Sequence, residues 1–179
     1  MILWQEDSIK NQNGVGKTME KQMDQLYPQI AEHILDMIPE DKWHEIYLYA
    51  EILDGSSNVY FYFNASEDGD NIYSHDISDK YGVSGEVYDD LLLGLQSKFE
   101  KLRKIFIDND QEAWTNLTLA LKYPGKLNIQ YSYEDMITSE LTSTQRQIIF
   151  EYQHLGLLPI SERNIQFLEG YLDNQDKSR

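Results

Sequence analysis

The sequence contains no cysteine and no long apolar run, and each absence excludes a class of protein. Without cysteine the chain has no disulfide scaffold, no cysteine-ligated zinc site and no thiol nucleophile. No stretch approaches the roughly 18 apolar residues of a membrane-spanning helix. The N-terminal sequence MILWQEDSIK lacks the basic segment and the apolar core of a secretory signal. We therefore expect a soluble, cytoplasmic globular protein.

Basic residues are scarce, at 15 against 31 acidic residues, so the formal net charge is −16. A field of this sign repels phosphate backbones and anionic membrane surfaces, whereas it attracts cations and basic proteins. The charge balance therefore argues against nucleic acid and membrane as direct partners. It is compatible with a basic protein as partner.

The length of 179 residues suits one domain with a single core. Residues 1–18 are polar and have no sustained apolar period, so we expect a flexible tail there. The single domain is expected to span 19–172, followed by a frayed tail over 173–179. Because Met19 opens the first helical pattern, one hypothesis is that it is the natural start.

Hydrophobic periodicity predicts the elements of the first half of the chain. Apolar residues spaced by three and four indicate a helix from Met19 to Ile38, which Pro28 should kink or restart. Two alternating strands, over 46–52 and 59–63, follow as a hairpin, because Asp54–Ser57 is a turn sequence. A further short strand is expected at 71–77.

Both helices and strands are also predicted in the second half of the chain. Ser84 is the expected N-cap of a long helix to Ile107. Two strands then share a turn at 123–126, and two helices are expected from Thr142 or Ser143 to His154 and from Ser161 to Tyr171. The predicted order is α-β-β-β-α-β-β-α-α. The fold class is therefore α+β, with an antiparallel sheet of about five strands packed with helices.

Several segments resemble chemical motifs, but each lacks an essential member. Asn13–Thr18 resembles the end of a phosphate loop without its first glycine, and Asn64–His75 resembles a calcium loop in which His75 replaces the bidentate glutamate. Gly82–Glu86 lacks the last glycine of a nucleophile elbow. Glu32, His33 and Asp36 could meet on one helix turn, and we interpret them as a surface histidine beside two carboxylates and not as a metal site. We predict no catalytic residue, no metal site and no cofactor.

One face of the first hairpin is rich in tyrosine. Tyr47, Tyr49, Tyr60 and Tyr62 alternate with the aliphatic residues and should project together from the opposite side. Tyrosine combines a large contact area with a polar tip and is enriched at protein interfaces. This face is thus a candidate binding surface. In the alternative interpretation, the C-terminal helices cover the face and the tyrosines are ordinary core residues.

Acidic segments follow this hairpin, and loops of this kind often carry recognition. We add residues from Glu67–Asp70 and Tyr73–Asp79 to the candidate surface. The predicted partner-binding residues are Tyr47, Tyr49, Tyr60, Tyr62, Glu67, Asp68, Asp70, Tyr73, His75, Asp76 and Asp79.

A family resemblance extends over many short stretches in a constant order. They are Leu26–Tyr27, Ile30–Ala31, Met37–Glu40, Trp43, Glu45–Tyr47, Val59–Phe63, Ile72–Ile77, Tyr81–Ser84, Phe99–Arg103, Trp114–Thr118, Tyr152 and Leu155–Pro159. Through them, roughly residues 19–172 resemble the YezG/EsaG-type immunity proteins. These are antitoxins paired with LXG-type and related nuclease toxins of Gram-positive bacteria, which leave the cell by type VII secretion.

The resemblance implies a cytoplasmic protein that binds and inhibits a cognate secreted nuclease toxin, with no catalytic motif of its own. The net charge agrees, because a nuclease carries positive charge to hold phosphates. One alternative is a non-inhibitory adaptor or export chaperone for a secreted partner. Another is a small hydrolase that uses scattered carboxylates and His75, but the spacing assembles no nucleophile, base and orienting group.

Overall fold

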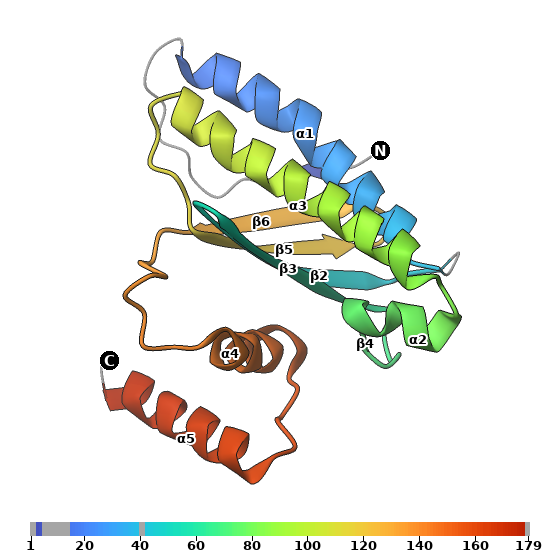
Figure 1. Cartoon of the computed structure of the whole chain (residues 1–179), viewed down its shortest axis with the longest axis vertical. Coiled ribbons are helices and arrows are strands. Elements are labelled where there is room, and N and C mark those ends of the chain that lie inside the picture. Colours follow the sequence, from blue (N-terminus) through green and yellow to red (C-terminus); the bar gives the residue numbers. More distant parts are fainter. Residues whose placement is uncertain (1–2, 5–14, 40–41, 178–179) are drawn as a thin grey trace. The chain divides into compact units, whose positions relative to one another are not determined.

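A sheet of six strands forms the centre of the larger part of the chain (Figure 1). The computed structural model describes residues 3–4, 15–39 and 42–177. The spatial order of the strands is β1-β6-β5-β2-β3-β4. Their bounds are β1 Leu3–Trp4, β2 Glu45–Leu53, β3 Ser56–Asn64, β4 Ile72–Tyr73, β5 Asn116–Lys122 and β6 Lys126–Ser132. The pairings among β2 to β6 are all antiparallel, which confirms the predicted α+β class.

The strand β1 was not predicted. It pairs in parallel with β6, so that Leu3 lies opposite Lys126 and Trp4 opposite Leu127. The following helix, α1, spans Val15–Met37 and begins before Met19. Leu3–Trp4 and Val15–Thr18 thus belong to a strand and a helix, whereas the flexible tail over residues 1–18 stays a prediction. Its remaining positions lie outside the described residues.

Two long helices cover one face of the sheet (Figure 1). They are α1 and α3, which spans Gly85–Asp108, and they lie side by side. The core-facing residues of β2 and β3 are the predicted aliphatic and phenylalanine positions, which pack with the apolar stripes of both helices. Each large apolar side chain buried in this way contributes about 1.5–3 kcal/mol. The alternation in the hairpin therefore selects the face that the helices cover.

Pro28 lies inside α1, so of the kink or restart expected there, the restart does not occur. A proline within a helix costs about 3 kcal/mol, because it removes a backbone donor and crowds the preceding turn. Leu26 and Ile30, two positions before and after the proline, are nonetheless deep in the core, 2% exposed and fully buried. The packing of this apolar stripe holds the helix together across the proline.

The strand predicted for residues 71–77 is wrong beyond its first residues. β4 ends at Tyr73, a 3₁₀ turn occupies Ser74–Asp76, and the short helix α2 spans Ile77–Tyr81. The buried Ser74 Oγ accepts a hydrogen bond from the backbone N–H of Phe61 at 3.0 Å. A side chain thus takes the position that a backbone carbonyl would occupy in a continued ladder, and the strand stops.

The C-terminal segment forms a separate compact unit. The chain divides into Met1–Glu134 and Asp135–Arg179, whereas the predicted limits of a single domain, 19–172, remain a prediction. The second unit contains α4, Ser143–Leu155, and α5, Glu162–Lys177. α5 continues to Lys177, and the frayed tail over 173–179 stays a prediction. Within the described residues, none of the helices combines the length and apolarity needed to cross a membrane.

The start of α4 agrees with its prediction. Thr142 is the N-cap, and its hydroxyl accepts a hydrogen bond from the backbone N–H of Gln145. The Gln145 side chain accepts in return from the backbone N–H of Thr142 at 2.9 Å. This capping box satisfies donors that the first turn leaves unpaired, which explains why the helix begins there.

Candidate partner-binding surface

The aromatic residues of the first hairpin form one continuous row with those of the next segment. Tyr49 and Tyr60 are directly opposite in β2 and β3, and their rings stack at 5.3 Å. Tyr60 also contacts Tyr62 at 6.3 Å, and Tyr62 stacks on Tyr73 of β4 at 5.0 Å. We call Tyr49, Tyr60, Tyr62, Tyr73, His75 and Tyr88 the aromatic row. The structure therefore brings together predicted residues from two sequence segments.

The end of the aromatic row includes a residue that the sequence analysis missed. His75 packs edge-on against Tyr73 at 5.1 Å and against Tyr88 at 5.7 Å. Tyr88 lies in the first turns of α3, where its spacing marks only a helix position. Nothing in the sequence separates it from other helical aromatic residues, so only the packing of α3 beside β4 and the 3₁₀ turn reveals it.

The tyrosines of the hairpin differ in exposure. Tyr49, Tyr60 and Tyr62 are 6%, 2% and 5% exposed, whereas Tyr47 and Tyr73 are half-buried. The three buried rings are closed to a partner in this arrangement. As binding residues, the four hairpin tyrosines remain a prediction.

Acidic groups at this hairpin are already paired. The hydroxyl of Tyr49 donates a hydrogen bond to Glu51 at 2.9 Å, and both residues are buried. Glu45 forms an ion pair with Lys122 at 2.5 Å, and the Lys122 ammonium lies 5.5 Å from the centre of the Tyr47 ring. The hydrogen bonds to Glu45 and Tyr47 raise the pKa of Lys122. Lys122 therefore balances the charge of Glu45, while Glu51 is buried and not open to direct contact with a partner.

The acidic residues of the loop and of α2 are different, because they remain open to solvent. Glu67, Asp68 and Asp70 lie in the β3–β4 loop, and Asp76 and Asp79 follow in the 3₁₀ turn and α2; all five are exposed. We call these five residues the acidic rim. In the part of the chain that the structure describes, none of them forms an ion pair. Their negative charge is thus available to an incoming cationic surface.

His75 is the titratable group next to this rim. Its Nδ1 atom lies 3.1 Å from the Tyr88 hydroxyl. Partial burial lowers the pKa of His75, and the nearby carboxylates of Asp76 and Asp89 only partly oppose that effect. Burial also raises the pKa of Tyr88 to about 12. At neutral pH, His75 is therefore mostly uncharged and does not neutralise the acidic rim.

The described residues of the segments that resemble chemical motifs take part in the packing and hydrogen bonding of the fold. His33 Nε2 contacts the Leu91 carbonyl oxygen at 2.7 Å, so this histidine joins α1 to α3. Asn64, the first position of the calcium-like loop, accepts the backbone N–H of Glu45 at 3.0 Å. No group of three metal-ligating side chains occurs among the described residues. Asn13 and Gly14 of the phosphate-loop fragment lie outside them, and Val15–Thr18 belong to α1.

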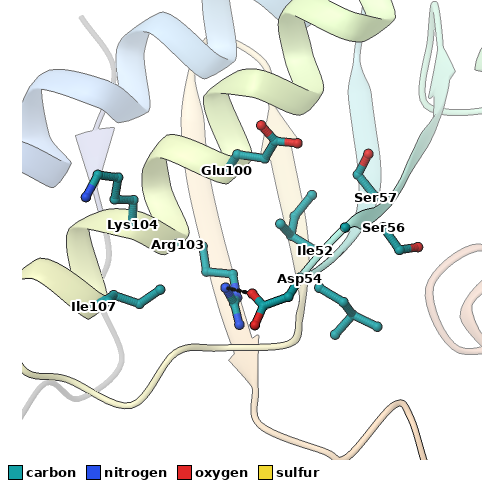
Figure 2. Close-up of a pocket in the computed structure, with 10 residues that line it drawn as sticks. Ile52, Asp54, Ser56, Ser57, Glu100, Arg103, Lys104 and Ile107 are labelled. Carbon is teal, nitrogen blue, oxygen red and sulfur yellow. Dashed lines mark hydrogen bonds and ion pairs between the residues drawn. The ribbon is translucent and has the colours of Figure 1, made fainter.

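A hollow of about 640 Å³ lies between the β2–β3 turn and α3 (Figure 2). Arg103 reaches across it to Asp54 at 3.0 Å and also donates to the Trp114 carbonyl oxygen at 3.1 Å. Glu100 and Lys104 line the same hollow. Nothing in the sequence marks these residues as a site, because charged helical positions and polar turns are common. The polar lining of the hollow is completed by Ser56 and Ser57 at the start of β3, and Arg103 is held in place by Asp54 and by the Trp114 carbonyl oxygen.

Comparison with known proteins decides the family. The family described as "Immunity protein YezG-like" matches residues 23–169. The chain belongs to the YezG-like immunity proteins. This finding confirms the resemblance inferred from the short stretches, and it assigns the chain an immunity role.

Relatives of this immunity protein match it over most of both chains. It is 47% identical over 154 residues to Immunity protein YezG of Bacillus spizizenii, covering 86% of this chain and 95% of the relative. It is 43% identical over 150 residues to Immunity protein YezG of Bacillus subtilis, covering 84% and 99%. It is 34% identical over 148 residues to the type VII secretion system protein EsaG of Staphylococcus aureus, covering 83% and 90%. The matches thus include both structural units.

Proposed function

We propose that this immunity protein binds the nuclease domain of a cognate secreted toxin in the cytoplasm and inhibits it without catalysing a reaction. The acidic rim is the observation that carries the proposal. It presents five exposed carboxylates without ion pairs among the described residues, in a chain of net charge −16. A nuclease has the complementary property, because its substrate groove must hold phosphates with cationic side chains.

Inhibition follows from occupying that groove. The rim would contact the phosphate-binding Lys and Arg side chains, and the protein behind it would exclude the nucleic acid. Long-range attraction between opposite fields speeds encounter, while close carboxylate–Arg pairs and aromatic contacts slow dissociation. The partner-facing residues in this proposal are Glu67, Asp68, Asp70, Asp76 and Asp79, with Tyr47, Tyr73 and His75 as partly or fully accessible ring contacts.

The buried part of the aromatic row has a supporting role in this proposal. Tyr49, Tyr60 and Tyr62 pack ring against ring, and Tyr62 stacks in turn on Tyr73 of β4. Aromatic pairs of this kind contribute about 0.5–1.5 kcal/mol beyond their area. They would hold β4 and the 3₁₀ turn in one position, so that less conformational entropy is lost when a partner binds.

A second candidate is a non-inhibitory adaptor or export chaperone. The observation that favours it is the name of the Staphylococcus aureus relative, which describes a type VII secretion system protein. An adaptor would use the same acidic rim to hold a basic partner. It would leave the partner's active site open.

One assay separates the two functions. The full chain is mixed with the purified nuclease domain of the toxin encoded beside its gene, and DNA cleavage is measured together with gel filtration. A 1:1 mixture should form a complex and abolish cleavage. A complex that still cleaves DNA would indicate the adaptor, whereas undiminished cleavage with no complex would overturn both functions.

A further inference from the structure

The connection between α4 and α5 exposes an unusual amount of aliphatic side chain. Leu158 is 71% exposed and Ile160 is 99% exposed, while Leu157 and Ile165 are each 38% exposed. Isolated exposed aliphatic residues are common on soluble proteins, but a contiguous group is typical of an interaction site. We call Leu157, Leu158, Ile160 and Ile165 the apolar turn.

The local structure does not require these side chains. Gly156 ends α4 with φ +65°, and its backbone N–H donates to the Tyr152 carbonyl oxygen. The start of α5 is held by Ser161, whose carbonyl oxygen accepts from the backbone N–H groups of Asn164 and Ile165 at 3.0 Å. Backbone hydrogen bonds therefore build both ends of the connection without help from the aliphatic groups.

Ile160 does not form the hydrophobic staple that is common at the start of a helix. With Ser161 at the N-cap of α5, Ile160 and Ile165 stand at the positions whose side chains form a hydrophobic staple. In this structure Ile160 is 99% exposed, so it does not pack against Ile165. The side chain is thus free to contact another molecule.

A stripe of carboxylates begins next to the apolar turn, at Glu162, and runs along α5. Glu162, Glu169, Asp173 and Asp176 are all exposed, and their spacing of seven, four and three residues places them on one face of α5. Ile165 borders the same face. None of the four forms an ion pair within the described residues. We call these four residues the α5 stripe.

We infer that the apolar turn and the α5 stripe form a second binding surface for the toxin, one that inserts Leu158 and Ile160 into an apolar recess surrounded by basic residues. This inference rests on the proposed function, because it names the same partner. Charge complementarity selects a cationic protein as occupant. A second copy of this chain fits poorly, since a two-fold contact would bring two α5 stripes together between chains of net charge −16.

The two surfaces should contribute to different rate constants. Exposed charges mainly set the association rate and its dependence on salt, whereas buried apolar anchors mainly set the dissociation rate. Substitution of Leu158 and Ile160 by serine removes apolar area without changing the net charge. It should therefore accelerate dissociation and leave association nearly unchanged.

The test is surface plasmon resonance with immobilised toxin nuclease domain and the full-length immunity protein. The variant Leu158→Ser/Ile160→Ser should dissociate about tenfold faster or more, at low and at physiological salt. The control Val87→Ser/Leu93→Ser removes two aliphatic side chains of α3 that are 52% and 61% exposed, and it should dissociate like wild type. Both variants should keep the wild-type circular dichroism spectrum.

The outcomes separate this inference from the proposed function. A wild-type complex that the Leu158→Ser/Ile160→Ser change does not weaken would overturn the second surface alone. Absence of any wild-type complex would overturn the proposed function and this inference with it. Analytical ultracentrifugation of the free protein checks the other occupant: a dimer that the same double change dissolves would assign the apolar turn to a second copy and overturn the inference.

Discussion

The Nδ1 atom of His75 lies 3.1 Å from the hydroxyl oxygen of Tyr88, and this contact joins the 3₁₀ turn after β4 to the first turns of α3. His75 is flanked on its other side by the ring of Tyr73, at 5.1 Å. The histidine next to the acidic rim is therefore held between two aromatic residues. Its protonation should be coupled to the stability of this corner of the sheet.

The first prediction concerns the titration of His75. Its pKa lies below the ordinary value of 6.5, because partial burial disfavours the imidazolium. In ¹H–¹³C NMR spectra recorded against pH, the His75 ring signals should therefore titrate with a midpoint below 6.5. A midpoint at or above that value would contradict the packing described here. His75→Gln identifies the signals by their loss.

The lowered pKa of His75 also makes the free energy of unfolding depend on pH. Below pH 6.5 the unfolded chain binds a proton at His75 before the folded chain does, so the free energy of unfolding falls as the pH drops toward the lowered pKa. Burial lowers the pKa of His154 in the same direction. The variant His75→Gln should consequently lose part, but not all, of this pH dependence in urea unfolding.

The second prediction concerns Ser74, which is fully buried. Ser74→Ala would leave the backbone N–H of Phe61 without its acceptor inside the protein. An unsatisfied buried donor costs about 1–3 kcal/mol, and urea unfolding should show a loss of that size. The matched control is Ser84→Ala at the exposed N-cap of α3, whose side chain makes no capping hydrogen bond. Equal losses in both variants would argue against the role assigned to Ser74.

The third prediction concerns the contact between α1 and α3. A Cβ atom added at Gly94 would lie 2.7 Å from the Cε1 atom of His33, whose ring is held by the Leu91 carbonyl oxygen. Gly94→Ala should destabilise the fold by about 1–3 kcal/mol, because overpacking exceeds the gain in helix propensity. Thermal and urea unfolding measure the change.

Two comparisons test that explanation. Gly170→Ala in α5 meets no atom within 4 Å and should stabilise its helix by about 0.5–1 kcal/mol. In a His33→Ala background the clash at Gly94 is removed, so Gly94→Ala should become neutral or stabilising there. The same loss with and without His33 would show that another contact opposes the alanine.

The fourth prediction concerns the acidic rim and salt. The variant Glu67→Lys/Asp68→Lys/Asp70→Lys should associate with the toxin nuclease domain at least about tenfold more slowly than wild type at low salt. Because the Debye length is only about 10 Å at 0.1 M ionic strength, the difference should shrink as salt increases. Stopped-flow association rates at several salt concentrations measure both effects.

A control with the same change in net charge isolates the position of the rim. Asp24, Glu32 and Asp36 are exposed residues of α1, and their replacement by lysine changes the total charge equally. This variant should keep a steeper salt dependence than the rim variant. Equal slowing in both would show that overall charge, and not the rim, steers the toxin.

Much of the fold could be predicted because its signals are local. The alternation in 46–52 and 59–63 predicted β2, β3 and their core face, and Thr142 predicted the start of α4 from its own capping chemistry. The early end of β4 at Tyr73 could not be predicted, because it depends on a hydrogen bond between Ser74 and Phe61, which lie 13 residues apart. The passage of α1 through Pro28 depends in the same way on core packing.

Some features of the candidate surface also follow from the sequence alone, and others depend on the tertiary structure. The sequence by itself determined the negative charge, the tyrosine-rich face of the hairpin and the family resemblance, since these depend only on residue identity and order. Only the tertiary structure decided that Tyr60 and Tyr62 are buried, that Tyr88 completes the aromatic row, and which carboxylates remain unpaired. Exposure and pairing arise from elements distant in the chain that pack together, and no local pattern encodes that contact.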